Sequence, residues 1–319
     1  MILGKLNIGS SGYKILIGVT TSTGSRILVT EDLGNSFYEW NVLGQNMHHN
    51  YFAPNLSGDT IISSLAGSSS GLFKVQDRGN TVTQLDSSFT SYGSVYSLSA
   101  TPTLSYIIYA VSSSTWGRVI RLSADQENFT SALIAGGSKR IMGCYISRTG
   151  QYIISPSAIT GSTDREYVYS TNYGASYGYS TYTSSSSTLF HSSSFVTDGG
   201  DGWYLLGSIG NRYSTSSGPY SNFSAISGNS GVIRGSSTGQ YKIYTPSGIM
   251  VSNNGSNTFT PAVSGSDIGY PFVSPSGKYM AATGGTSFYL SQDFGETFLT
   301  VSVPNITGIG RIFLLTPDN

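Results

Sequence analysis

Short runs of β-branched and aromatic residues recur along the whole chain, and each run ends at Gly, Ser, Asn or Pro. The clearest are YKILIGVT from Tyr13, TIISSL from Thr60, QYIISPS from Gln151 and SFYLS from Ser287. Such runs, closed by turn residues, are typical of short β-strands. No segment carries the period of an amphipathic helix, and Glu, Lys, Leu and Ala are sparse. The pattern predicts an all-β fold.

An octet of the form S/T-x-D-x-G-x-S/T-aromatic recurs between these runs. Its fullest copies are TEDLGNSF from Thr30 and SQDFGETF from Ser291, and five degraded copies lie between them. The acidic or equivalent positions are Asp32, Asp77, Asp125, Asn172, Ser216, Asn254 and Asp293, spaced 45, 48, 47, 44, 38 and 39 residues apart. The chain therefore contains seven repeats.

A second motif supports the same count. A turn followed by an aromatic or β-branched strand occurs roughly twenty residues before each octet. The copies are SSGYKIL, LSGDTII, TLSYIIY, RTGQYII, GGDGWYL, STGQYKI and PSGKYMA. Two turn types therefore alternate seven times.

A repeat of this length, carrying four short strands, has the size of one propeller blade. We predict a single seven-bladed β-propeller, and a right-handed β-helix is the alternative architecture. The predicted blades span approximately residues 1–45, 46–90, 91–138, 139–190, 191–228, 229–266 and 267–319. Both KLNIGS at the start and RIFLLTPDN at the end fit the strand that closes the first blade, and the sequence leaves the choice open.

The octet resembles the Asp-box, or bacterial neuraminidase repeat, of sialidases, sortilin-type receptors and several seven-bladed lectins. The resemblance implies a structural hairpin between the third and fourth strands of a blade, remote from the ligand site. The residues also favour a structural role, because a short polar side chain can accept hydrogen bonds from its own turn and Gly supplies a positive φ. The residues assigned to these turns are Asp32, Gly34, Asp77, Gly79, Asp125, Asn172, Gly174, Asn254, Asp293 and Gly295.

Chain direction predicts that the remaining connections lie on the opposite face, away from Asp293. Those connections vary in sequence, and variable loops on a rigid scaffold commonly bind ligands. An aromatic platform with a few fixed polar groups would suit a saccharide. The candidate ligand-binding residues in these loops are His48, His49, Tyr51, Tyr92, Trp116, Arg118, Arg140, Arg165, His191 and Arg212.

Enzyme chemistry finds less support in the sequence. A sialidase-like hydrolase would need an arginine cluster, a tyrosine nucleophile beside a glutamate and an acid catalyst. Glu39 and Glu166 are the only glutamates outside the octets and their degraded copies. No metal is expected at His48 and His49, because neighbouring residues on a strand point to opposite faces. We therefore predict no catalytic residues and no cofactor, and glycoside hydrolysis remains the alternative.

Charge composition narrows the class of partner. Only 10% of the residues are charged, and they cancel to a formal net charge of +0. Nucleic acid and anionic lipid are therefore not expected partners. No run of about 20 apolar residues predicts a membrane helix, and no signal peptide is visible. The Tyr-, Ser-, Thr- and Gly-rich composition resembles that of viral receptor-binding spikes. We expect a glycan- or receptor-binding protein, on a virion surface or extracellular, with other virion proteins as further candidate partners. A structural assembly module is a further alternative.

Overall fold

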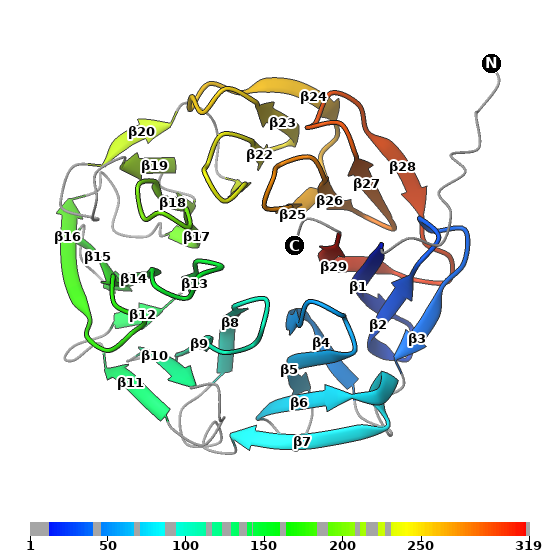
Figure 1. The fold of residues 1–319 in the computed structure, drawn as a ribbon, viewed down its shortest axis with the longest axis horizontal. Coiled ribbons are helices and arrows are strands. Elements are labelled where there is room, and N and C mark those ends of the chain that lie inside the picture. Colours follow the sequence, from blue (N-terminus) through cyan, green and yellow to red (C-terminus); the bar gives the residue numbers. More distant parts are fainter. Residues whose placement is uncertain are drawn as a thin grey trace.

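The polypeptide forms seven small antiparallel sheets arranged in a ring (Figure 1). The computed structural model describes residues 13–40, 46–66, 71–86, 94–112, 117–122, 129–133, 139–141, 143–159, 164–183, 191–207, 211–214, 223–226 and 231–316. Within these residues the one helical element is the 3-10 turn η1 (Asp77–Gly79). The protein is a seven-bladed β-propeller, as the repeats predict.

In the first four blades the strands follow one another from the axis outwards (Figure 1). Blade 1 contains β29 (Gly308–Leu315), β1 (Lys14–Thr21), β2 (Gly24–Thr30) and β3 (Tyr38–Trp40). Blade 2 contains β4 (Asn46–Pro54), β5 (Thr60–Ala66), β6 (Leu72–Gln76) and β7 (Thr81–Asp86). Blade 3 contains β8 (Ser94–Ala100), β9 (Ile107–Ser112), β10 (Gly117–Leu122) and β11 (Phe129–Leu133). In blade 4, β12 (Lys139–Ile141) and β13 (Tyr145–Ile146) pair with β14 (Ile153–Ile159), which is followed by β15 (Asp164–Ser170) and β16 (Gly178–Thr183).

The other three blades follow the same order. Blade 5 contains β17 (His191–Val196), β18 (Trp203–Gly207), β19 (Asn211–Ser214) and β20 (Ser224–Ile226). Blade 6 contains β21 (Val232–Gly235), β22 (Lys242–Thr245), β23 (Gly248–Ser252) and β24 (Thr260–Ser264). Blade 7 contains β25 (Ile268–Val273), β26 (Met280–Gly284), β27 (Ser287–Ser291) and β28 (Leu299–Ser302).

The C-terminal strand closes the ring. β29 pairs antiparallel with β1, so that Lys14 lies opposite Leu315 and Ile17 opposite Ile312. The first blade thus takes its innermost strand from the end of the chain and its other three strands from the beginning (Figure 1). The sequence left two candidates for this strand, and the C-terminal one, RIFLL, fills the position. The segment KLNIGS lies outside the described residues.

The core consists of apolar layers between neighbouring blades. Second strands contribute to two layers at once: Ile61 packs between blades 1 and 2, whereas the next residue, Ile62, packs between blades 2 and 3. Ile107 and Ile108 divide in the same way between the layers on either side of blade 3. Because both faces of these strands are buried, apolar residues stand at consecutive positions and do not alternate with exposed polar ones.

The turns between the first and second strands share one geometry in six blades. In blade 7, Ser274 Oγ accepts a hydrogen bond from the Tyr279 amide at 3.1 Å, and the amide of Gly277 donates to the Ser274 carbonyl at 3.0 Å. Equivalent turns begin at Asn55, Thr101, Ser147, Thr197 and Ser236. The glycine has a positive φ and also lies against the preceding blade: a Cβ on Gly277 would be 2.4 Å from Tyr241 Cβ. The second sequence motif therefore packs one blade onto the next.

The octets form hairpin turns between the third and fourth strands. In blade 7, Asp293 Oδ1 accepts hydrogen bonds from Ser291 Oγ at 2.7 Å and from the Thr297 amide at 3.0 Å. Asp32 in blade 1 and Asn172 in blade 4 accept the equivalent bonds. Gly34, Gly174 and Gly295 all have a positive φ. These side chains hold the hairpins together.

Two octets depart from that arrangement. Asn254 Oδ1 accepts from the amide of Ser256, in agreement with the displaced glycine of this copy. Asp77 begins η1 and accepts from Thr81 Oγ1 at 2.8 Å, as Asp293 does from Thr297 Oγ1. Val75 has no hydroxyl group, so it cannot donate to Asp77 as Ser291 does to Asp293. Gly79 keeps the positive φ of its equivalents. Asp125 lies outside the described residues.

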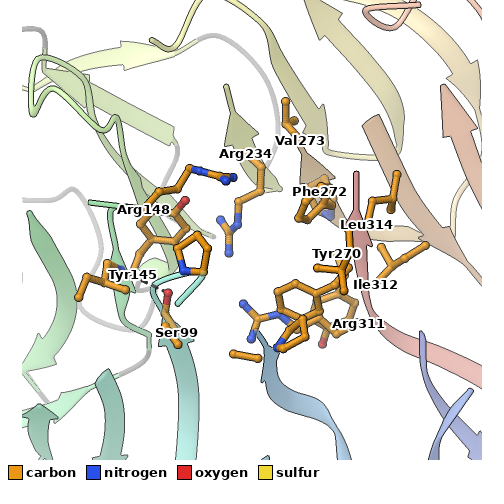
Figure 2. A pocket seen from close by; sticks show the side chains of 18 of the residues that line it. Ser99, Tyr145, Arg148, Arg234, Tyr270, Phe272, Val273, Arg311, Ile312 and Leu314 are labelled. Carbon is orange, nitrogen blue, oxygen red and sulfur yellow. Dashed lines mark hydrogen bonds between the residues drawn. The ribbon is translucent and has the colours of Figure 1, made fainter. Parts of the chain in front are cut away.

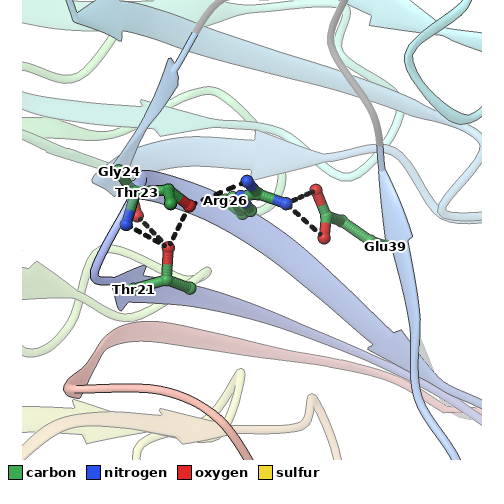
Figure 3. A network of polar contacts seen from close by, with 5 residues as sticks. All are labelled: Thr21, Thr23, Gly24, Arg26 and Glu39. Atoms are coloured by element: carbon green, nitrogen blue, oxygen red, sulfur yellow. Dashed lines mark hydrogen bonds and ion pairs between the residues drawn. The ribbon is translucent and has the colours of Figure 1, made fainter.

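A polar network ties the outer strands of blade 1 (Figure 3). Arg26 Nη1 donates to both carboxylate oxygens of Glu39, at 2.7 and 2.8 Å, and Arg26 Nη2 donates to Thr23 Oγ1 at 2.9 Å. Both charged side chains are partly exposed, so the pair contributes at most about 1 kcal/mol. Glu39 is thus engaged by an arginine on the surface of the sheet.

Candidate functional site

The predicted ligand-binding residues lie on strands wherever the structure describes them. Tyr92 and Trp116 fall outside the described residues. The other eight belong to strands, whereas the sequence predicted loops: His48, His49 and Tyr51 in β4, Arg118 in β10, Arg140 in β12, Arg165 in β15, His191 in β17 and Arg212 in β19. For all of these except Tyr51, the structure describes the backbone position alone.

Topology nevertheless brings most of them to one face. Arg118, Arg165 and Arg212 are each the second residue of a third strand, and Arg140 and His191 lie at the start of first strands. First and third strands of a blade begin on the same side of the ring, because consecutive strands are antiparallel. That side is opposite the octet hairpins. The backbone positions of these residues thus lie at the face that the sequence predicts. Contact between their side chains and a ligand stays a prediction.

A separate cavity of about 130 Å³ lies on the propeller axis. Its walls come from the final residues of the innermost strands and from the turns that follow them, including Ala53–Leu56, Tyr145–Ile146 and Arg311–Leu315. These turns share a face with the octet hairpins. This cavity therefore lies toward the face of Asp293, and not toward the face that the sequence favoured.

Two arginines project into this cavity (Figure 2). In β21, Arg234 Nη1 donates to the carbonyl oxygens of Ser194 at 3.1 Å and Ile233 at 2.7 Å. In β29, Arg311 Nη1 donates to the carbonyl oxygen of Leu98 at 2.9 Å. These backbone contacts hold each guanidinium group at a fixed place in the wall.

Burial lowers the pKa of both arginines. The pKa of Arg234 falls to about 10, chiefly because its charged form is desolvated, and the positive charge of Arg311 adds to the effect. Desolvation also lowers the pKa of Arg311. Both groups stay protonated at neutral pH. The cavity therefore carries two like charges in an environment that penalises charge.

Aromatic rings complete the wall. Tyr145 lies beneath Arg234, whose guanidinium carbon is 5.2 Å from the ring centroid. Desolvation raises the pKa of the Tyr145 phenol, so this group stays neutral. Arg311 similarly lies 5.0 Å from the Phe313 ring centroid. Cation–π contacts of this kind partly offset the cost of burying each charge.

A third cation, Arg148, stands at the turn end of the cavity and interacts with a carboxylate. Its Nε lies 3.9 Å from Asp198 Oδ2, and its amide donates to Asp198 Oδ1 at 2.7 Å. This pair joins the turns of blades 4 and 5. The described residues that line the cavity include no aspartate or glutamate.

Tyr270 occupies a strained position in the wall. Its φ is 34°, a value that non-glycine residues rarely adopt, and its side chain is 43% exposed. Tyr270 lies where the register of β25 against β26 shifts between Gly269 and Phe272. β29 has a comparable irregularity against β1, where Ile309 and Ile312 pair with Val19 and Ile17, and Arg311 lies within it. Bulges of this kind redirect side chains, often beside functional sites.

Arg234, Arg311, Tyr145 and Tyr270 line the cavity but are not among the residues predicted from the sequence. One signal was available for two of them, because Tyr145 and Arg234 each stand two residues before the first turn residue, Ser147 or Ser236. Aligning the repeats on that residue would have gathered the inward positions of the innermost strands. No comparable signal marks Arg311 or Tyr270, which depend on bulges.

Cys144, the one cysteine of the chain, is buried. Burial raises the pKa of the Cys144 thiol to about 12, so it is not a ready nucleophile. Within the described residues there is no group of three His, Cys, Asp or Glu side chains placed to hold a metal ion. Nor does the part of the chain that the structure describes contain a helix long and apolar enough to cross a bilayer.

The fold is shared with structures of diverse proteins. A protein from Lactobacillus plantarum is 14% identical, with 95% of this chain and 99% of that chain covered and a TM-score of 0.62. A proposed 6-phosphogluconolactonase from Bacteroides fragilis is 14% identical over 95% and 98% of the two chains, with a TM-score of 0.61. TolB from Acinetobacter baumannii is 11% identical over 96% and 67%, with a TM-score of 0.58.

At these identities the comparisons establish the propeller fold alone, and a fold by itself does not determine a function. Neither a protein-family profile nor a curated protein sequence matches the chain.

Proposed function

We propose that this propeller is a non-enzymatic binding protein that recognises a glycan or a host-surface receptor, as an exposed component of a virus or phage particle. The observation that carries the proposal is the backbone placement of the predicted residues. Arg118, Arg140, Arg165, His191 and Arg212 begin first or third strands, so one face of the ring gathers them. The low charge content and the abundance of Tyr and Ser fit polar recognition on such a face.

The hairpins support a further part of the proposal, the Asp-box type of the blades. The octets of blades 1, 4 and 7 make the same side-chain to backbone hydrogen bonds around Asp32, Asn172 and Asp293. A polar side chain used in this way stabilises its own turn. These residues are therefore proposed to build the blades and to take no part in ligand binding.

Binding to a glycan array and to intact host cells tests the proposal. We expect specific retention of the wild-type protein and at least a tenfold loss in the double variant Trp116→Ala, Arg118→Ala. Leu299→Ala is the matched control, because Leu299 is 51% exposed on the outer strand β28 and lies away from the proposed face. A protein that binds neither glycans nor cells would contradict the proposal.

A panel of fluorogenic glycosides separates binding from hydrolysis. We expect no turnover, since Glu39 is held by Arg26 and no described carboxylate lines the axial cavity. Turnover that Glu166→Gln abolishes would instead establish a glycoside hydrolase.

A further inference from the structure

The axial cavity gathers positive charge, which the face described above does not explain. Arg234 and Arg311 point into one small space, and the described residues lining it supply no carboxylate. Both are buried cations whose charged forms are desolvated. An anion placed between them would be attracted by both charges.

The geometry of the guanidinium groups suits an oxyanion. A guanidinium group offers five N–H donors in a planar fork, which matches the oxygens of a carboxylate. One nitrogen of each group, Nη1, is anchored to backbone carbonyl oxygens. The anchors hold each guanidinium group in place before any ligand arrives, and both side chains point into the cavity (Figure 2). Such preorganisation lowers the entropic cost of binding.

Two of the residues that line the cavity lie where their strands are irregular. Arg311 and Tyr270 lie in bulges of β29 and β25, the innermost strands of adjacent blades. The φ of 34° at Tyr270 costs free energy that regular pairing would avoid. Both irregularities turn a side chain toward the same cavity. Bulges and strained residues concentrate at binding and active sites.

Size and polarity restrict the ligand. A cavity of about 130 Å³ is far below the 300–1,000 Å³ typical of drug-sized ligands, so it can hold a group about the size of benzene. Pro271, Phe272 and Phe313 give it apolar walls beside the two cations. A small ligand with an apolar ring or chain and one acidic group would match both the apolar walls and the two cations.

We propose that the axial cavity binds a small organic carboxylate, with the carboxylate between Arg234 and Arg311 and the apolar body against Phe272 and Tyr270. The site is distinct from the proposed glycan or receptor face, because it lies on the axis at the opposite end of the innermost strands. Its occupation would join blades 6, 7 and 1, which supply these four residues. A ligand there would stabilise the closure of the ring.

Calorimetric titration with benzoate, benzyl alcohol and inorganic sulfate tests the site. We expect benzoate to bind the wild-type protein with a Kd below about 1 mM, and benzyl alcohol, its neutral analogue of similar shape, to bind at least about tenfold more weakly. Sulfate should also bind more weakly than benzoate, because it cannot use the apolar walls. Equal binding of benzyl alcohol, or no benzoate binding, would overturn the proposal. Sulfate as tight as benzoate would overturn the assignment of the apolar body.

Variants locate the binding within the cavity. Arg311→Gln and Arg234→Gln should each weaken benzoate binding at least about tenfold. Arg26→Gln is the matched control and should bind as the wild type does, because Arg26 pairs with Glu39 on the outer strands. Unchanged benzoate binding in both cavity variants would refute the site. Should a cavity variant fail to fold, the comparison of benzoate with benzyl alcohol on the wild-type protein still decides the matter.

Discussion

Individual polar side chains in this protein mainly stabilise turns through hydrogen bonds. Asp293 looks like a candidate for catalysis when its octet is considered alone, yet both of its oxygens accept hydrogen bonds from Ser291 or Thr297. These bonds favour the charged carboxylate and lower the pKa of Asp293, against the opposing effect of desolvation. Its chemistry is used to fix the backbone.

Lys242 plays a similar part in blade 6 and makes stability depend on pH. Its side chain is buried, and Nζ donates to the carbonyl oxygens of Gly239 at 2.7 Å and Gly255 at 3.0 Å. Desolvation lowers its pKa from 10.5 to about 8. Between these values the unfolded chain holds a proton that the folded protein has lost, so the free energy of unfolding rises with pH.

We expect this rise to reach up to about 1 kcal/mol per pH unit between pH 8 and 9, measured by urea unfolding. Above pH 9 the buried Cys144 thiol, with its pKa raised to about 12, acts in the opposite sense. Lys242→Met should abolish the rise, whereas Lys278→Met should keep it, because Lys278 is exposed. An undiminished slope in Lys242→Met would contradict this assignment.

At the scale of elements, the turns determine how blades stack. The positive φ of Gly277 would strain any other residue, and its Cα faces the Tyr241 side chain of the preceding blade. Gly150 and Gly200 face Tyr106 and Tyr152 in the same way. Each of these glycines therefore packs against the preceding blade, and each of these tyrosines packs against the glycine of the following blade.

Replacing these glycines separates backbone strain from interblade packing. Gly277→Ala and Gly255→Ala both place alanine at positive φ, 85° and 75°, but a Cβ on Gly255 has no neighbour within 4 Å. Each should lose about 1–2 kcal/mol of stability through backbone strain. Gly277→Ala should lose about 1–3 kcal/mol more through overpacking against Tyr241, as measured by chemical unfolding. Equal losses would show that the contact is unimportant.

At the scale of the whole molecule, stability depends on one strand contributed by the end of the chain. β29 buries Ile312, Leu314 and Leu315 in the layers on either side of blade 1. Each of these side chains contributes about 1.5–3 kcal/mol on burial, and a typical domain is stable by about 5–15 kcal/mol. Removing the strand also exposes the edge of β1.

Truncation after Asn305 should therefore abolish cooperative thermal unfolding or lower the Tm strongly. A chain ending at Thr316 is the control and keeps all of β29, so its transition should match that of the full-length protein. A cooperative, unshifted transition in the shorter chain would show that another segment closes the ring.

The sequence by itself determined the number of blades, the class of fold and, in the blades whose turns the structure describes, the position of both turn types. These features depend on local chemistry, such as turn residues and consecutive apolar residues in strands, which repeats seven times and is visible without any long-range contact. The tertiary structure decided the rest. Closure by β29 joins residues about 300 positions apart, and the cavity gathers Arg234, Tyr270 and Arg311 from three blades. The bulges that aim two of these residues leave no periodic trace, so only the folded ring brings the charges together.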